Sequence, residues 1–285
     1  QKFFFNISLD KQKFFLNKFN FLLIINSKVD QLFHAIVCIH YHNVEKIKKS
    51  ISNLNKFNPD IDNYENFDFI VIGSGPSGSI TASELQKISD KILLIDKGDD
   101  YNLSDSKHPG DEFLKKWAHG GIDTTIYKSQ INFSSGSCFG GGSEINSGLY
   151  HYPDAEFLSE WKNDFETQEI EFDKIEKFIS ETKEKTGVSN LDLSLKYQES
   201  LFLEGAKKLN LKVENIPRLS SINKDEKIYK NSMSKTYLND YIKNGGKTLL
   251  STEVEKVFFK NKRWAVKCFD LINRKKFELK TKYLF

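Results

Sequence analysis

The sequence predicts an α/β protein built on a parallel sheet, and three observations carry this prediction. Residues 67–98 contain two short apolar runs that are separated by a helical pattern. Residues 135–153 form a glycine-rich stretch with aromatic residues among the glycines. Residues 248–283 contain four further apolar segments of strand length. Because two strands joined by a helix normally pair in parallel, this succession predicts a Rossmann-like domain over residues 63–285.

Length and composition fit one large globular domain or two ordinary ones. The 285 residues are 39% hydrophobic and 13% aromatic, and the net charge is only +3. A charge this small, with lysines scattered among acidic residues, gives no indication of a nucleic-acid partner. Cys38, Cys138 and Cys268 lie far apart without CxxC spacing. We therefore expect reduced thiols, no disulfide framework and no metal site.

Residues 1–62 differ in character from the rest of the chain. Their apolar runs are interrupted by Asn17, Lys18 and Asn20, and they are far shorter than the ~20 residues of a membrane span. The apolar positions from Val29 onward have helical spacing, so we expect a helical extension without a transmembrane segment. No small-residue cleavage site of a signal peptide follows, and we expect a cytoplasmic protein.

The βαβ unit carries a glycine fingerprint. Phe69–Ile72 is expected to be a buried strand, and Gly73-Ser74-Gly75-Pro76-Ser77-Gly78 follows it directly, before a helix. Gly73 permits a tight turn, Gly75 lets a pyrophosphate approach the backbone, and Gly78 lets the helix pack closely on the sheet. Phosphates are expected at the amino terminus of the helix, where unpaired N–H groups and the helix dipole favour negative charge.

An acidic residue completes the fingerprint. The second apolar run, Ile92–Ile95, ends at Asp96, which lies 23 residues after Gly73. A carboxylate in this place accepts hydrogen bonds from adenosine ribose hydroxyls and repels a 2′-phosphate. The strand, helix and acidic residue together predict adenine-dinucleotide binding. The alternative is a glycine-rich turn in an unrelated α/β fold, and the fingerprint alone leaves both FAD and NAD open.

The second glycine-rich stretch has the character of a packed loop. Gly140, Gly141 and Gly142 are followed by Ser143, so the backbone can run against a ligand and direct N–H groups at it. Asn146 adds a side-chain amide one helical turn later. A flexible surface loop is the alternative, but such loops are usually polar throughout. The aromatic and apolar residues around these glycines favour a functional loop.

This stretch resembles the first signature of the glucose–methanol–choline (GMC) flavoprotein oxidoreductases. Ser137 and Phe139 depart from the residues that are usual in the family. The spacing between the two motifs also fits the family, and the resemblance covers about residues 68–285. It implies FAD rather than NAD as the cofactor. The residues that match the signature are Gly136, Gly140, Gly141, Gly142, Ser143, Ile145, Asn146, Tyr150 and Pro153.

The resemblance also implies which residues hold FAD. In the family this loop wraps the pyrophosphate and the flavin, and in some members a His of this region attaches FAD covalently. Ile145 and Asn146 stand at those positions, so we expect non-covalent FAD. A valine backbone of a later strand contacts adenine in the family, which corresponds to Val254, although an edge strand without a ligand is the alternative there. The expected FAD-binding residues are Gly73, Ser74, Gly75, Pro76, Ser77, Gly78, Asp96, Lys97, Gly140, Gly141, Gly142, Ser143, Asn146 and Val254.

The other expected elements follow from apolar spacing. We expect helices within residues 111–117, 155–187 and 195–209, and a helix that ends at the glycine pair 245–246. The four expected strands of the carboxyl-terminal part are residues 248–251, 254–259, 264–268 and 277–283.

The ends of the sequence suggest a fragment, because it begins at Gln1 and stops at Phe285 directly after an expected strand. In the family the catalytic base is a His near the far carboxyl terminus, so we expect the catalytic residues beyond residue 285. We assign no catalytic role to His108, His119 or His151.

The function that the resemblance implies is FAD-dependent oxidation of the CH–OH group of a small-molecule alcohol, with hydride transfer to flavin N5. The electron acceptor stays open among oxygen, a quinone and a cytochrome. One alternative is a flavin enzyme of another class, such as an amine oxidase or hydroxylase. The other is a flavin-binding or electron-transfer module without alcohol-oxidising activity of its own.

Overall fold

The computed structural model describes residues 67–101, 110–121, 123–125, 131–153, 155–164, 172–190, 197–222 and 228–285. The chain divides into two compact units, one of residues 1–49 and 103–114 and the other of residues 50–102 and 115–285. In the first unit the described residues are 110–114, which begin helix α5 (Gly110–Lys116). The helical extension predicted over residues 1–62 lies outside the described residues.

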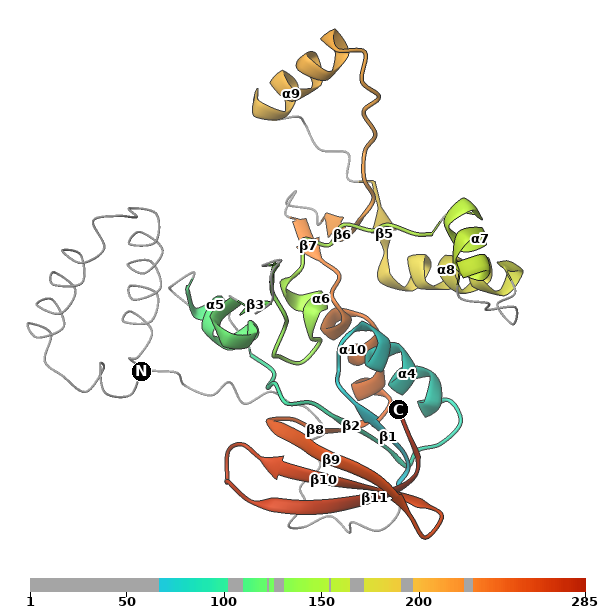
Figure 1. Ribbon diagram of the computed structural model, residues 1–285, viewed down its shortest axis with the longest axis vertical. Helices are drawn as coiled ribbons and strands as arrows, with labels where there is room; N and C mark the ends of the chain where they lie inside the picture. Colours follow the sequence, from blue (N-terminus) through green and yellow to red (C-terminus); the bar gives the residue numbers. More distant parts are fainter. Residues whose placement is uncertain are drawn as a thin grey trace, which may run out of the picture. The chain divides into compact units, whose positions relative to one another are not determined.

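The second unit contains a six-stranded sheet in the order β8-β2-β1-β11-β10-β9 (Figure 1). Strands β8, β2, β1 and β11 are parallel, whereas β10 and β9 continue the sheet as antiparallel neighbours. This mixed sheet confirms the predicted Rossmann-like α/β class. The strands are β1 (Phe67–Ile72), β2 (Ile92–Ile95), β8 (Lys247–Leu249), β9 (Thr252–Lys260), β10 (Arg263–Asp270) and β11 (Lys276–Leu284).

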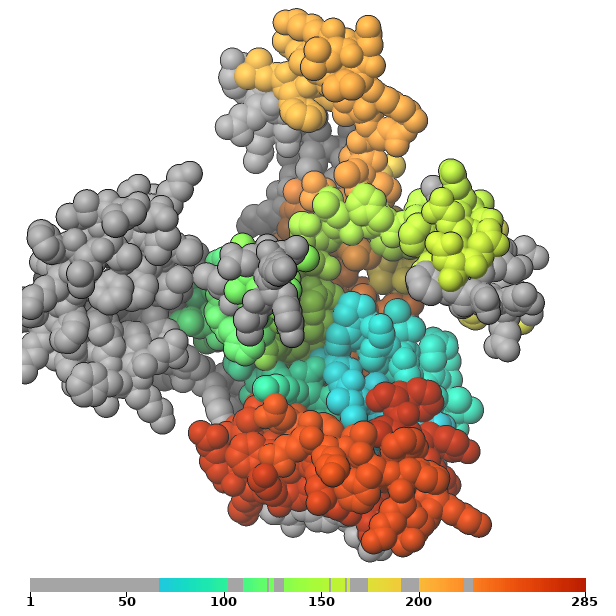
Figure 2. Space-filling view, viewed as in Figure 1, coloured from blue at the N-terminus to red at the C-terminus, as the bar shows by residue number. Residues whose placement is uncertain are grey.

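Strand β1 is central because it pairs with strands from both ends of the described chain. Phe69 lies opposite Ile92 of β2 on one side and opposite Tyr283 of β11 on the other. In Figure 2 the cyan residues of the amino-terminal βαβ unit accordingly lie against the red residues of the carboxyl-terminal strands. The four residues of β2 are at most 1% exposed, as expected for a parallel strand with both faces covered.

Helices α4 (Pro76–Gln86) and α10 (Tyr237–Lys243) cover one face of the parallel strands (Figure 1). Successive side chains of β1 and β2 point to opposite faces of the sheet. Alternate residues therefore enter two different clusters, one under the helices and a second one on the other face. Central residues of the helix-covered cluster are Val71, Leu94, Ala82, Leu238 and Tyr241. Central residues of the second cluster are Ile70, Leu93, Ile95, Leu249, Val266 and Leu279.

The remaining described elements are shorter or lie outside the main sheet. The helices expected near residues 111–117, 155–187 and 195–209 are confirmed as α5, α7 (Ala155–Asp164) with α8 (Phe172–Thr186), and α9 (Tyr197–Lys208). No helix in the described part of the chain has the length and apolar character that a membrane crossing requires. The other elements are η1 (Ala118–Gly121), β3 (Asp123–Thr124), β4 (Asn132–Phe133), α6 (Gly142–Ile145), β5 (Val188–Ser189), β6 (Arg218–Ile222), β7 (Ile228–Lys230) and η2 (Met233–Lys235).

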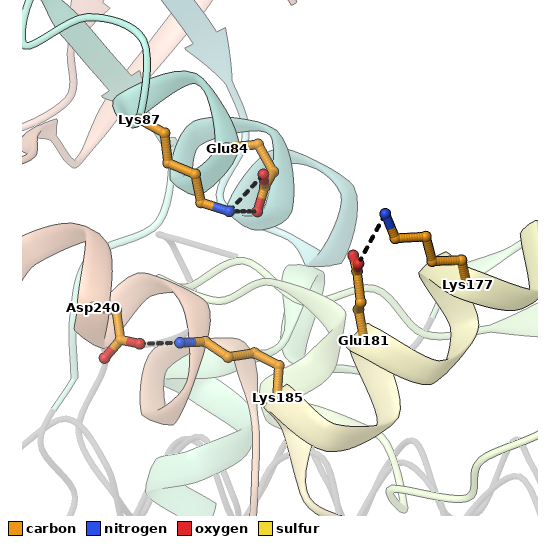
Figure 3. Close-up of polar contacts among 6 residues, drawn as sticks. All are labelled: Glu84, Lys87, Lys177, Glu181, Lys185 and Asp240. Carbon is orange, nitrogen blue, oxygen red and sulfur yellow. Dashed lines mark hydrogen bonds and ion pairs between the residues drawn. The ribbon is translucent and has the colours of Figure 1, made fainter. Parts of the chain in front are cut away.

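The end of α8 is fastened to the segment that contains η2 and α10. Lys185 of α8 forms an ion pair with Asp240 of α10 (Figure 3). The other two pairs are local: Glu84 of α4 pairs with Lys87, the C-cap residue of that helix, and Lys177 pairs with Glu181 within α8. The carbonyl of the buried Thr186 also accepts a hydrogen bond from Asn231 Nδ2 at 3.0 Å. These contacts hold the 231–243 segment to the end of α8 at Asn231 and at Asp240.

Gly246 closes the turn after α10 against a buried ring. Tyr241 is fully buried, which raises the pKa of its phenol, and its hydroxyl donates a hydrogen bond to the carbonyl of Lys247 at 2.8 Å. A Cβ on Gly246 would lie 2.5 Å from the Tyr241 ring carbons Cε1 and Cζ. The glycine stop that the sequence predicts here is therefore also a packing requirement.

We expect Gly246→Ala to lower the free energy of unfolding by about 1–3 kcal/mol, because a buried ring has no free space into which to retreat. Urea denaturation measures the change. The control is Gly205→Ala in α9, where an added Cβ meets no atom within 4 Å. That variant should be neutral or gain up to about 1 kcal/mol, since alanine favours a helix over glycine. Equal stability of the two variants would contradict the packing described for Tyr241.

Candidate functional site

The turn after β1 has the geometry that its glycines require. Gly73 has a φ of 93°, which side-chain-bearing residues rarely adopt, and its N–H donates to the carbonyl of Ile95 at 2.7 Å. A Cβ on Gly78 would collide with the carbonyl oxygen of Gly73. The close packing predicted for Gly78 is therefore confirmed, and it brings the first turn of α4 directly over the end of β1.

Gly75 borders open space. It is the N-cap residue of α4, in an extended conformation, and Pro76 follows it in the first helical turn. Among the described residues, a Cβ on Gly75 would meet no atom within 4 Å, and none of their side chains caps the helix. The first N–H groups of a helix lack partners within the helix, so this end of α4 presents donors and partial positive charge beside an open volume.

The carboxylate of Asp96 is held against this turn. Its Oδ2 accepts hydrogen bonds from both the N–H and the hydroxyl of Ser74, each at 2.6 Å, and its Oδ1 accepts one from the N–H of Gly98 at 2.7 Å. An ionised carboxylate has about four acceptor positions. Three of them are used inside the protein, which leaves capacity on Oδ1 for one further donor.

The Ser74 side chain joins the fingerprint to the second glycine-rich stretch. Ser74 is fully buried, and its hydroxyl donates to Asp96 while it accepts a hydrogen bond from the N–H of Gly140 at 2.9 Å. A residue that sequence reasoning assigned to the cofactor thus has its side chain committed to the protein. Its hydroxyl fixes the positions of two segments that are 66 residues apart.

The backbones of the two glycine-rich segments touch. A Cβ on Gly141 would lie 2.8 Å from Cα of Gly75, and a Cβ on Gly136 would lie 2.5 Å from the carbonyl carbon of Gly141. Gly140 and Gly141 have φ values of 94° and 56°. A Cβ on Gly98 would also collide with the backbone of Cys138. Glycine is therefore required along this contact, and the close approach of Gly98 is one that the sequence did not predict.

The far side of the loop is held by the segment from Lys230 to Ser234. The Ser143 hydroxyl donates to the carbonyl of Gly140 at 2.7 Å and accepts a hydrogen bond from the N–H of Met233 at 3.0 Å. Glu144 Oε1 accepts a longer one, 3.3 Å, from the N–H of Ser234. Sequence reasoning missed this support because these partners lie 90 positions apart and carry no motif.

Four other residues of the expected site occupy its edges. Gly142 and Asn146 are exposed, and Asn146 Oδ1 accepts a hydrogen bond from the N–H of Gly148 at 3.1 Å. Lys97 is exposed and its ammonium lies 2.7 Å from Glu253 Oε1. Val254 is partly buried on β9, which begins beside Asp96. The structure thus brings the expected residues to one end of the sheet.

Two ionisable side chains near the loop, Cys138 and Tyr101, have raised pKa values. Burial raises the pKa of the Cys138 thiol to about 12, and burial followed by the charge of Asp99 raises the pKa of Tyr101. His119 lies 2.7 Å from Asp123 through its Nδ1 and is exposed, as is His151. His108 lies outside the described residues. Neither described histidine is hydrogen-bonded to the residues of the site.

The fold and these two segments define an α/β protein of the Rossmann-like class with a glycine-lined site at the carboxyl ends of its parallel strands. The family model described as GMC oxidoreductase matches residues 67–283. The chain belongs to the GMC oxidoreductase family, as the motifs predicted.

Individual relatives are distant and longer. The chain is 27% identical over 203 residues to the long-chain-alcohol oxidase FAO4B of Arabidopsis thaliana, an alignment that covers 66% of this chain and 26% of that protein. It is 25% identical over 208 residues to the GMC-type oxidoreductase y4nJ of Sinorhizobium fredii, which covers 70% of this chain and 41% of the relative. The chain therefore spans between a quarter and two fifths of the length of these curated relatives.

A solved structure shares the fold. Pyridoxine 4-oxidase from Mesorbium loti superimposes with a TM-score of 0.57 over 77% of this chain and 48% of that chain, at 12% sequence identity. At this identity the similarity concerns the fold alone.

We expect Ser74→Ala to loosen the contact between the two glycine-rich segments. The variant leaves the buried N–H of Gly140 without its acceptor, which costs about 1–3 kcal/mol. Hydrogen exchange at the Gly140 amide should accelerate in the ligand-free protein. Ser77→Ala, in which the exposed side chain is removed from the same turn, should leave that exchange rate unchanged. Unaltered exchange in Ser74→Ala would show that the hydroxyl does not hold the loop.

Proposed function

We propose that this chain is the FAD-binding part of an oxidoreductase that acts on the CH–OH group of an alcohol. The observation that carries the proposal is the open volume in front of Gly75, where an added Cβ would meet no atom of the described residues within 4 Å. This volume lies at the uncapped amino terminus of α4 and next to the glycine-rich loop. Membership of the GMC oxidoreductase family supports FAD as the occupant.

The residues fit the diphosphate of FAD. The backbone N–H groups of Ser77 and Gly78 belong to the first turn of α4, and we propose that they bind phosphate oxygens beside Gly75 and Pro76. Among the described residues, no carboxylate is hydrogen-bonded to these groups, so an anion would meet donors and the positive end of the helix dipole.

Asp96, Lys97 and Val254 are proposed to border the adenosine. Because three acceptor positions of Asp96 are already used, we propose that Oδ1 accepts one ribose hydroxyl and that the carboxylate acts mainly by repelling a 2′-phosphate. Val254 lies on β9 two residues after Thr252, whose N–H donates to the carbonyl of Asp96 at 3.0 Å. This places the proposed adenine contact next to the proposed ribose contact.

The loop from Gly140 to Asn146 is proposed to continue the site from the pyrophosphate to the flavin. An added Cβ on the exposed Gly142 would meet no atom of the described residues within 4 Å, so its backbone is open to a ligand. The Ser143 hydroxyl is engaged with Gly140 and Met233, so Ser143 would contact FAD through its backbone. Ile145 and Asn146 carry no nucleophile for a covalent link, and we propose non-covalent FAD.

When bound, FAD supplies the two-electron acceptor that takes a hydride at N5 from the alcohol carbon. We propose that the chain's part is to bind and orient the cofactor. We propose that the base for the hydroxyl proton lies carboxyl-terminal to residue 285, in the length of the curated relatives that this chain does not span. The names of the alcohol-oxidase relatives support an alcohol substrate over a flavin module without such activity.

The variant Gly75→Val tests the cofactor assignment in the full-length protein. The added side chain points into the open volume, so the fold should persist while the pyrophosphate is displaced. We expect the purified variant to melt within a few degrees of the ligand-free wild type and to contain no flavin. The measurement is the flavin absorbance per polypeptide.

The matched control is Gly205→Ala, which also adds a side chain into open space but lies on α9. It should retain the flavin of the wild type. A Gly75→Val protein with the full flavin absorbance would refute the proposed place of the pyrophosphate.

A further inference from the structure

Lys230 reaches from the end of β7 to the end of α6. Its Nζ donates hydrogen bonds to the carbonyl oxygens of Glu144, at 2.6 Å, and of Asn146, at 2.8 Å. Its stem passes Gly148, where an added Cβ would lie 3.5 Å from Lys230 Cδ. A lysine 84 positions away thus contacts the loop at the point where the chain leaves α6.

Both carbonyls lie at the carboxyl-terminal end of α6. α6 is a single helical turn, and the carbonyls at the end of a helix have no partner within it and carry partial negative charge. Hydrogen bonds from an ammonium group to such oxygens are stronger than neutral ones. Lys230 therefore fixes the direction in which the backbone leaves the turn.

Asn146 is consequently held at every backbone group. Its N–H donates to the carbonyl of Gly142 at 3.0 Å, and its carbonyl is bound by Lys230. Its side-chain Oδ1 accepts a hydrogen bond from the N–H of Gly148 at 3.1 Å, which orients the amide. No described residue accepts a hydrogen bond from Nδ2. The amide thus presents its two hydrogens from a fixed position on an exposed residue.

We propose that Lys230 is a positioning residue that sets the Asn146 amide for the bound flavin. This inference rests on the proposed function, because it takes the loop to be part of an FAD site. Lys230 itself contacts the loop through the carbonyl oxygens of Glu144 and Asn146. The lysine is in turn steadied by its segment, since Asn231 binds the carbonyl of Thr186 and Met233 binds Ser143.

The test compares Lys230→Met with wild type in the full-length protein. Methionine keeps most of the stem and removes the charge and the donors. We expect FAD to bind at least about tenfold more weakly, because charge-assisted hydrogen bonds to the loop are lost. We also expect the absorption bands of the bound flavin to shift, since the amide no longer holds its place. Lys230→Arg should restore both, because its planar fork also reaches two carbonyls.

Two further variants separate positioning from mere stability. Lys235→Met, in which an exposed lysine of the same segment is changed, should bind FAD with the affinity and spectrum of the wild type. Asn146→Ala should reproduce the spectral shift of Lys230→Met, and the double variant should add less than the sum of the two losses.

The outcomes are decisive in each case. Wild-type protein that does not bind FAD refutes the proposed function, and this inference falls with it. If the wild-type protein binds FAD and Lys230→Met has the same affinity and spectrum, the positioning role alone is overturned. Strictly additive losses of FAD affinity in the double variant would also overturn the positioning role. If Lys230→Met does not fold, Lys230→Gln takes its place, and failure of both to fold would make Lys230 a folding residue and overturn the proposal.

Discussion

The Ser74 hydroxyl holds together the three segments from which the site is built. It donates to Asp96 at the end of β2 and accepts from Gly140 of the glycine-rich loop, and it does so from the turn that follows β1. The group is fully buried, so each of these bonds replaces one that water would otherwise make. Loss of either partner leaves a buried polar group unsatisfied, and for this reason the relative positions of the turn, the carboxylate and the loop are strongly determined.

The glycines of the turn and the loop leave one side of this contact open to a ligand. Gly141 lies so close to Gly75 that neither backbone leaves room for a side chain between them, whereas the outward side of Gly75 is open. On the other side the loop rests on Lys230 and Met233, which bind the end of α6 and Ser143. The loop is therefore fixed from both flanks and open along its middle. Such prior ordering lowers the entropy that a ligand must remove when it binds.

The sequence predicted the local parts of this arrangement and not the contacts between them. The βαβ unit, the strands after residue 247 and the glycine-rich loop were predictable because their signals are short-range: apolar runs, helical spacing and glycine spacing. Family membership followed from the same motifs, and the match over residues 67–283 confirms it. The pairing of β11 with β1 and the support of Ser143 by Met233 join residues that are far apart in the chain, and no local pattern marks them.

Asp96 shows where a fingerprint is incomplete. Its spacing predicts a ribose ligand, but spacing does not reveal that Ser74 and Gly98 already occupy most of its acceptor positions. The binding roles of the fourteen residues assigned to FAD stay predictions, and the helical extension over residues 1–62 lies outside the described residues. Small elements such as β3, β4 and β5 were missed because strands of two residues carry no periodic signal.

Hydrogen exchange with and without FAD tests the central claim, that the turn at Gly75 and the loop from Gly140 to Asn146 form one cofactor site. Measured on the full-length protein, FAD should slow exchange in both segments together, with the same dependence on FAD concentration, while NAD should slow neither. Protection of the Gly75 turn alone, or equal protection by NAD, would contradict the account.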